Sequence, residues 1–167
     1  MSTAMARVEY LVVHCSATAA SPTITASTIE GWHRKQGWKD IGYHFVVLTD
    51  GSWQVGRPLT VMGAHVGPAY NRRSLGICMV GGADANGRAV NNFHAAQFQG
   101  LETLLRNLRT SYQNAVICGH RDLSPDRDGD GIVEPHEWVK QCPSFDVRAW
   151  CQQIGLDPLP MPAPRRT

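Results

Sequence analysis

The hydrophobic positions of the chain form short runs that are separated by polar and amphipathic stretches. The run 9–16 is rich in β-branched residues and ends in small polar ones, which predicts a buried strand carrying His14 near its carboxyl end. The runs 74–81 and 115–119 are also short and apolar and predict further strands of the same sheet. The second of these leads directly into His120.

A helix is predicted over 25–36. The stretch begins with residues that cap helices, and Gly37 follows as a residue that ends them. The N-cap is expected to be Thr25 or Ser27. Glu30 lies three residues after Ser27, the spacing of a capping box.

A hairpin and a second, longer helix complete the expected architecture. Two strand-like runs in 43–56 flank Asp50 and Gly51, a strong turn signal, so Tyr43 is expected to begin a strand next to the first one. The stretch 93–108 is amphipathic, and four leucines are expected to face the sheet: Leu101, Leu104, Leu105 and Leu108. The whole pattern predicts a single-domain α/β fold in which helices flank a central mixed β-sheet.

Composition and charge exclude several other classes of protein. The chain has 167 residues, 43% of them hydrophobic, which suits one compact domain with one active site. It has 16 basic and 14 acidic residues, so no electrostatic footprint for nucleic acid is expected. The five cysteines include no Cys-x-x-Cys pair, which indicates buried thiols and not a disulfide framework or a zinc knuckle.

The two ends of the chain predict neither a membrane segment nor further folded structure. The N-terminus has no positive start followed by a long apolar stretch, and 10–13 is too short for a signal peptide or a membrane span. Synthesis as a soluble chain in the cytoplasm is therefore expected. Four prolines and two arginines follow Asp157, so the catalytic domain is expected to span 1–157 and a flexible tail 158–167.

Three residues could together hold a zinc ion. His14 and His120 follow or end predicted strands, and Cys142 lies in a Lys-Gln-Cys-Pro-Ser-Phe segment. Two histidines and a thiolate leave a fourth position open, as in catalytic zinc sites. Spacing alone supports this site weakly, because the three residues are far apart and a histidine at a strand end is often only a hydrogen-bonded residue.

The motifs around these residues add much stronger support. They are Val-His-Cys-Ser-Ala-Thr (13–18), Trp-His-Arg-Lys-Gln-Gly-Trp (32–38), Ile-Gly-Tyr-His-Phe (41–45), Gly-His-Arg (119–121) and Lys-Gln-Cys-Pro-Ser-Phe-Asp (140–146). In order and spacing they strongly resemble the type-2 amidase family, which includes the zinc amidase endolysins of T-odd coliphages and the peptidoglycan recognition proteins. The resemblance covers roughly 9–156 and implies the fold of that family.

The resemblance implies a function and assigns residues to it. His14, His120 and Cys142 match the zinc ligands of an amidase that cleaves the bond between N-acetylmuramic acid and the L-alanine of the stem peptide. Family members that only bind peptidoglycan commonly lack the thiolate that Cys142 supplies here. Tyr43 matches a residue that orients or deprotonates the attacking water, and Lys140 one that stabilises the oxyanion.

Ordinary structural interpretations of the non-ligand residues remain open. A tyrosine at the start of a strand is usually half-buried, and a lysine is usually a solvated surface charge. Because Lys140 lies two residues before the proposed ligand, we favour the catalytic interpretation. His65 lies in a turn-rich segment where the family places a histidine bordering the substrate groove, so it is a candidate substrate-binding residue.

An acidic insertion between His120 and Cys142 departs from the shorter phage relatives. The segment 126–137 matches the calcium-loop pattern D-x-D-x-D-G-x5-E at every defined position. The expected calcium ligands are Asp126, Asp128, Asp130, the carbonyl of Ile132, Glu134 and Glu137. Prolines near both ends of the segment leave no room for the flanking helices of an EF-hand, and an acidic surface loop is the alternative.

Two other functions are weighed against the amidase. The first is a peptidoglycan-binding module without catalysis. The second is a regulatory partner of RNA polymerase, which rests only on one phage relative. An endolysin of a phage or prophage would act as a monomer on the cell wall or in the periplasm, after another protein had permeabilised the membrane.

Overall fold

A five-stranded mixed sheet forms the centre of the protein. The computed structural model describes residues 5, 7–156 and 158–165. The strands are β1 (Tyr10–Cys15), β2 (Phe45–Val47), β3 (Trp53–Val55), β4 (Ser74–Met79) and β5 (Val116–Gly119), in the order β3-β2-β4-β1-β5. β1 is parallel to β4 and β5, β2 is parallel to β4, and β3 is antiparallel to β2. The predicted α/β fold with a mixed sheet is confirmed.

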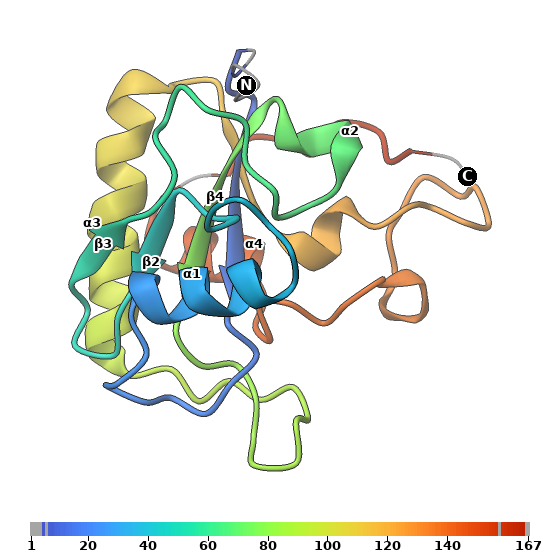
Figure 1. Ribbon diagram of the computed structural model, residues 1–167. Helices are drawn as coiled ribbons and strands as arrows, with labels where there is room; N and C mark the ends of the chain where they lie inside the picture. Colours follow the sequence, from blue (N-terminus) through green and yellow to red (C-terminus); the bar gives the residue numbers. More distant parts are fainter. Residues whose placement is uncertain (1–4, 6, 157, 166–167) are drawn as a thin grey trace.

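Helices cover both faces of this sheet (Figure 1). They are α1 (Ala26–Lys35), α2 (Pro68–Asn71), α3 (Ala95–Ser111) and α4 (Val147–Gln153), with 3-10 turns at η1 (His120–Leu123) and η2 (Pro135–Glu137). Odd-numbered side chains of β1 pack against α3 and α4, and even-numbered ones lie on the α1 and α2 face. Because strand residues alternate between faces, a strand covered on both sides is buried along its whole length, and in β1 only His14 interrupts the largely apolar run.

The start of α1 differs in detail from the expectation. Thr25 is the N-cap, and its side-chain oxygen accepts from the backbone N–H of Thr28. The Thr28 hydroxyl in turn accepts from the backbone N–H of Thr25, so these two residues form the capping box. The Ser27–Glu30 pair was the wrong choice, because helical geometry begins at Ala26 and Glu30 instead forms an ion pair with Arg34.

The long helix α3 packs on the sheet as its leucine spacing predicts. All four leucines at three-and-four spacing are buried: Leu101, Leu104, Leu105 and Leu108. The buried Gln97 ties the helix to the sheet, since its side-chain amide donates to the carbonyl of Val80 at 2.9 Å. Within the described part of the chain, no helix is both long and apolar enough to cross a bilayer.

The neighbours of β2 correct one expectation. Tyr43 lies just before β2, and β2 pairs with β4 and β3 and not with β1. β4 takes the inner position beside β1 and is therefore buried along its whole length. The hairpin itself is confirmed, and its second strand, β3, is exposed at the sheet edge.

Part of the C-terminal segment packs on the domain over 158–165, and the flexibility expected for the whole tail 158–167 stays a prediction. Leu159 and Met161 contact the cluster that contains Tyr10 and Val12. Arg148 donates to the carbonyl of Leu159 at 3.1 Å. Apolar residues between the prolines give this segment a face to bury, which the proline content alone did not reveal. Asp157 and residues 166–167 lie outside the described residues.

Candidate metal centre

Two neighbouring parallel strands bring the two candidate histidines together. His14 is an even-numbered residue of β1 on the α1 and α2 face, and its side chain is 1% exposed. His120 directly follows β5, which lies beside β1. Because the carboxyl ends of parallel strands meet at one edge of the sheet, the two imidazole rings lie with centroids 4.8 Å apart.

Cys142 approaches the same point from the loop before α4. Its carbonyl accepts from the backbone N–H of Arg121 at 3.0 Å, and its Sγ accepts from the backbone N–H of Cys15 at 3.3 Å. These two contacts anchor the loop to the ends of β5 and β1.

The donor atoms of the three residues fit a tetrahedral zinc ion. One ligand atom from each of His14, His120 and Cys142 lies within 4.8 Å of the others. The Nδ1 of His14 is 3.7 Å from the Sγ of Cys142. Zinc–nitrogen and zinc–sulfur bonds of about 2.1 and 2.3 Å at a tetrahedral angle place such atoms about 3.6 Å apart.

Burial prepares the two histidines to act as ligands. It lowers the pKa of His14 well below its usual value and that of His120 to about 4, and the charge of Lys140 adds to both shifts. Both rings are therefore neutral at pH 7, the form that binds metals. The adjacent Cys15 thiol and burial raise the pKa of Cys142 well above its usual range, so its thiolate needs a cation beside it.

Tyr43 and Lys140 both border this centre. The ring centroid of Tyr43 is 5.2 Å from that of His14. Burial raises the pKa of the Tyr43 phenol well above its usual value, which keeps the proton on its oxygen. This favours orienting a water over deprotonating it. Lys140 is exposed and lines the same cleft.

His65 contacts the Nε2 side of the His14 ring, away from Cys142. Its Nδ1 is 2.9 Å from the Nε2 of His14, and its Nε2 is 3.3 Å from the hydroxyl of Ser74. Burial lowers the pKa of His65 to about 3, so the ring is neutral. The side chain borders the cleft, and its contact with substrate stays a prediction.

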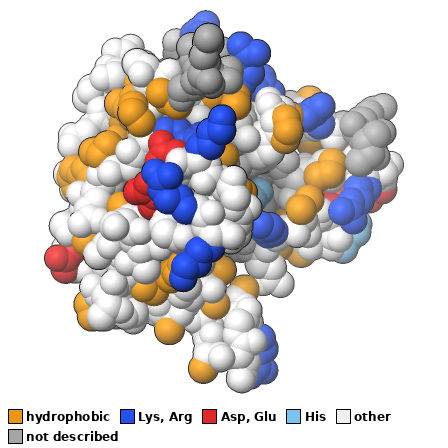
Figure 2. Space-filling model, in the orientation of Figure 1, with side chains coloured by type: hydrophobic (Ala, Val, Ile, Leu, Met, Phe, Trp, Pro, Cys, Tyr) orange, Lys and Arg blue, Asp and Glu red, His pale blue; other side chains and the backbone are white. Residues whose placement is uncertain are grey.

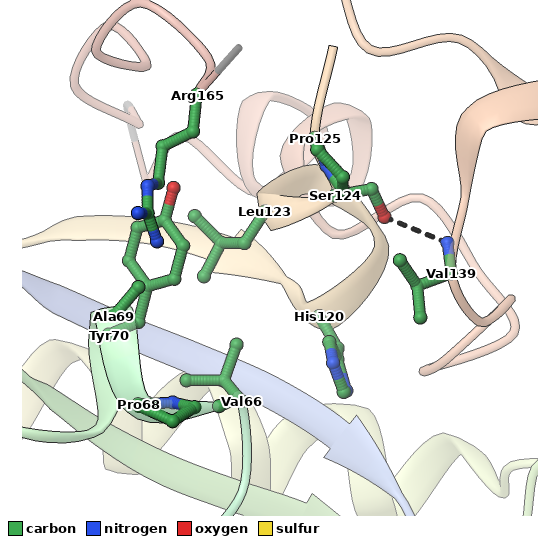
Figure 3. A pocket seen from close by; sticks show the side chains of 11 residues that line it. Val66, Pro68, Ala69, Tyr70, His120, Leu123, Ser124, Pro125, Val139 and Arg165 are labelled. Carbon is green, nitrogen blue, oxygen red and sulfur yellow. Dashed lines mark hydrogen bonds between the residues drawn. The ribbon is translucent and has the colours of Figure 1, made fainter. Parts of the chain in front are cut away.

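A cleft of about 650 Å³ opens over the candidate metal centre, and His14, His33, Tyr43 and Lys140 are among the residues that line it. A second hollow of about 740 Å³ shares four lining residues with it: Val66, Gly67, His120 and Val139. In Figure 3, Arg165 of the C-terminal segment extends alongside the Tyr70 ring in this second hollow. Basic side chains are dispersed over the face drawn in Figure 2 and do not gather in one patch, in keeping with the net charge of +2.

The acidic insertion forms a second group of possible metal ligands. Oxygens of Asp126, Asp128 and Glu137 lie within 4.8 Å of one another. Asp126 is 2% exposed and Glu137 is 0% exposed. Backbone N–H groups, that of Arg127 first among them, donate to Glu137 and lower its pKa. The short turn η1 precedes the segment, η2 forms its last three residues, and the next helix begins only at Val147, so helices of EF-hand length do not flank it, as the prolines predicted.

Two contributors to the centre were missed in the sequence. Cys15 was interpreted as a core thiol, yet its backbone N–H donates to the candidate ligand Cys142. Ser74 was only a residue of a predicted strand, yet its hydroxyl faces His65. Neither contact has a local sequence signal, since one joins positions 15 and 142 and the other depends on how the loop that carries His65 folds over β4.

Comparison with known proteins gives a consistent result. A family model described as N-acetylmuramoyl-L-alanine amidase matches residues 4–144. The endolysin of Klebsiella phage KP32 is 40% identical over 146 residues, 87% of each chain. The endolysin of Escherichia phage T7 is 38% identical over 160 residues, 91% of this chain and 96% of its own.

Solved structures agree with these matches. The N-acetylmuramoyl-L-alanine amidase LysC from Clostridium intestinale superposes with a TM-score of 0.67 at 25% identity, covering 90% of this chain and 85% of its own. Bumblebee PGRP-SA has a TM-score of 0.72 at 20% identity, covering 97% and 90%, and this match bears on the fold alone.

Proposed function

This chain belongs to the N-acetylmuramoyl-L-alanine amidase family, and on that premise we propose that it is a zinc-dependent hydrolase of peptidoglycan. Its reaction is cleavage of the amide bond between N-acetylmuramic acid and the L-alanine of the stem peptide. The observation that supports this most directly is the convergence of His14, His120 and Cys142 at the floor of an open cleft. A groove that only bound peptidoglycan would not need a partly buried thiol within 4.8 Å of two neutral imidazoles.

The side chains around the cleft divide the catalytic work. When bound, zinc polarises the scissile carbonyl and lowers the pKa of a water molecule toward neutrality. Tyr43 holds its proton and orients the attacking water by hydrogen bonding. The Lys140 ammonium at the cleft wall stabilises the negative charge that develops on the carbonyl oxygen.

Digestion of purified sacculi tests this proposal. Mass spectrometry should detect stem peptides that begin with a free L-alanine amino group, and zinc chelation should abolish their release until zinc is restored. Cys142→Ser should lose zinc and hydrolysis while remaining folded. Cys151→Ala changes a buried thiol in α4 and serves as the matched control, because it should keep both. Full activity of a metal-free preparation would contradict the mechanism.

The competing function is peptidoglycan binding without catalysis. Under that alternative, the wild-type protein would bind sacculi and release no peptide at any zinc concentration. Co-sedimentation with sacculi, measured together with peptide release, separates the two functions.

We also propose that the insertion 126–137 binds calcium as a structural ion. The support is the complete match to the calcium-loop pattern and the convergence of Asp126, Asp128 and Glu137. Asp130, Glu134 and the carbonyl of Ile132 would complete the ligand set. Glu137 lies three residues before Lys140 (140 − 137) and five before Cys142 (142 − 137), so an ordered loop would support both.

Calorimetry and thermal unfolding test the calcium proposal. Calcium at a hundred times its dissociation constant should stabilise the fold by about 2.7 kcal/mol through mass action. A calcium-selective chelator at constant zinc should lower the melting temperature and turnover, and Asp126→Ala or Glu137→Ala should have the same effect. Asp84→Ala, a change of an acidic residue outside the loop, is the control. An absence of calcium binding would reduce the segment to an acidic surface loop.

We further propose that the biological context is that of an endolysin, supported by the phage relatives. The protein would then reach the wall only after the membrane had been permeabilised. Expression in a host with and without a membrane-permeabilising protein tests this, since lysis should require both. RNA polymerase binding and a monomeric state stay predictions, and co-purification and light scattering would test them.

A further inference from the structure

The metal centre rests on a chain of hydrogen bonds that begins at a backbone carbonyl. The hydroxyl of Ser74, a side chain with no exposed surface, donates to the carbonyl of Tyr70 at 2.8 Å. A hydroxyl has one proton, and a carbonyl can only accept. The Ser74 oxygen must therefore accept from the Nε2 of His65, which lies 3.3 Å away.

This first assignment determines the proton positions on both histidine rings. A neutral imidazole donates from one nitrogen and accepts at the other, so His65 with a proton on Nε2 presents a lone pair at Nδ1. The Nε2 of His14, 2.9 Å from that lone pair, must then carry a proton. His14 is left with its lone pair on Nδ1, the nitrogen that lies 3.7 Å from the Sγ of Cys142.

The strands fix the geometry of this chain. Residues 74 and 76 lie on the same face of β4, next to Tyr10 and Val12 of β1 in the strand register. The His65 ring lies over Gly76, where a Cβ would come within 2.6 Å of the ring. The carboxamide oxygen of Asn71 accepts from the backbone N–H of His65 at 3.0 Å. Gly76 thus leaves room for the His65 ring on the sheet, and Asn71 fixes the His65 backbone.

We propose that His65 and Ser74 are positioning residues for the metal centre. They hold His14 with Nε2 protonated and with the Nδ1 lone pair directed at the metal position. Hydrogen-bond partners behind a ligating histidine orient the ring and increase its basicity as a ligand. Both nitrogens of His65 are used in this chain, so His65 acts through His14 and not through substrate. The inference rests on the proposed zinc site.

Zinc affinity of the full-length protein, measured by competition with a chromophoric chelator, tests the proposal. His65→Ala should raise the zinc dissociation constant about 10- to 100-fold. Ser74→Ala should raise it in the same direction by a smaller factor. His65→Asn should recover most of the affinity, because its side-chain oxygen can take the acceptor position of Nδ1.

His44→Ala is the matched control. His44 is buried on the same side of β4, and its ring centroid is 5.8 Å from that of His65. Among the described residues, its ring nitrogens hydrogen-bond only to the backbone of Gly76 and Val61. The His44→Ala variant should have a lower melting temperature, but its zinc dissociation constant should stay within about threefold of wild type. That change is smaller than the one expected when the hydrogen-bond partner of a zinc ligand is removed. Equal loss of zinc affinity in His44→Ala and His65→Ala would show a general packing effect and overturn the proposal.

Nitrogen NMR of labelled histidines in the metal-free protein gives a second, direct measurement. The wild type should show His14 and His65 each protonated at Nε2, and His14 protonated at Nδ1 would overturn the assignment. If His65→Ala does not fold, His65→Asn and Ser74→Ala decide the question. A higher KM with unchanged zinc affinity in those variants would make His65 a substrate residue and overturn the inference. A wild type that binds no zinc would instead refute the proposed function.

Discussion

Tyr43 and Lys140 lie beside the candidate ligands, and we expect them to contribute to turnover more than to metal binding. Lys140→Ala and Tyr43→Phe should each lower kcat about a hundredfold or more, because both groups are proposed to act on the transition state. Zinc content per chain should not change. Measuring kcat and zinc content in the same preparations checks this. Normal turnover of Lys140→Ala would show that Lys140 is an ordinary surface charge without a catalytic role.

Individual histidines should also make the metal-free protein sensitive to pH. Burial lowers the pKa of His44 to about 4 and that of His65 to about 3, against 6.5 for an unperturbed imidazole. Between these values the unfolded chain binds protons that the folded chain does not. The free energy of unfolding is therefore highest above pH 6.5, where both histidines are neutral in the folded and the unfolded chain. As the pH falls from 6.5 toward 4, protons bind to the unfolded chain, and the free energy of unfolding drops by roughly 1.4 kcal/mol per pH unit for each histidine.

Urea unfolding of the metal-free protein at pH 7.5, 6 and 5 measures this dependence. His44→Asn should make the dependence shallower by about the share of one histidine. Equal free energies of unfolding at pH 7.5 and pH 5 would contradict the expected neutral state of these rings.

At the level of elements, α3 packs against the β2–β3 turn at a point where only glycine fits. A Cβ on Gly100 would overlap the carbonyl oxygen of Gly51, whereas a Cβ on Gly31 of α1 would meet nothing within 4 Å. Gly31→Ala should therefore stabilise the protein by about 0.5–1 kcal/mol, the usual gain for alanine in a helix. Gly100→Ala should destabilise it by about 1–3 kcal/mol through overpacking.

The two substitutions are chemically identical, so each controls for the other. Chemical denaturation of both variants gives the comparison directly. Changes of the same sign would mean that α3 can move away from the turn at little cost.

For the whole molecule, the C-terminal segment should contribute to stability. Deleting residues 158–167 would uncover the cluster around Tyr10 and remove the partly buried Leu159 and Met161. Full burial of such a side chain is worth about 1.5–3 kcal/mol, so we expect a combined loss of roughly 2–4 kcal/mol. Thermal unfolding of the truncated protein measures it, and Arg165→Ala is the control, because it leaves the apolar contacts in place. An unchanged melting temperature after truncation would show that the segment only rests on the surface.

Local patterns in the sequence were sufficient for most of the elements and for the candidate ligands. Alternation, leucine spacing and turn residues depend on near neighbours, which is why β1, α3 and the hairpin at Gly51 were predicted. The motifs around His14, His120 and Cys142 indicated one metal site because each motif is short and contiguous. Local patterns also led to the wrong capping box for α1. They did not reveal the apolar contacts of the C-terminal segment, because its prolines dominated the interpretation.

Tertiary structure decided the features that depend on distant parts of the chain. The strand order placed β4 between β1 and β2, which no local pattern specifies. That order brought Ser74 and His65 behind His14 and directed the backbone N–H of Cys15 at Cys142. Hydrogen bonds depend on distances of a few tenths of an ångström. Sequence spacing can place a residue at the end of a strand, but only the packed sheet fixes which atoms meet there.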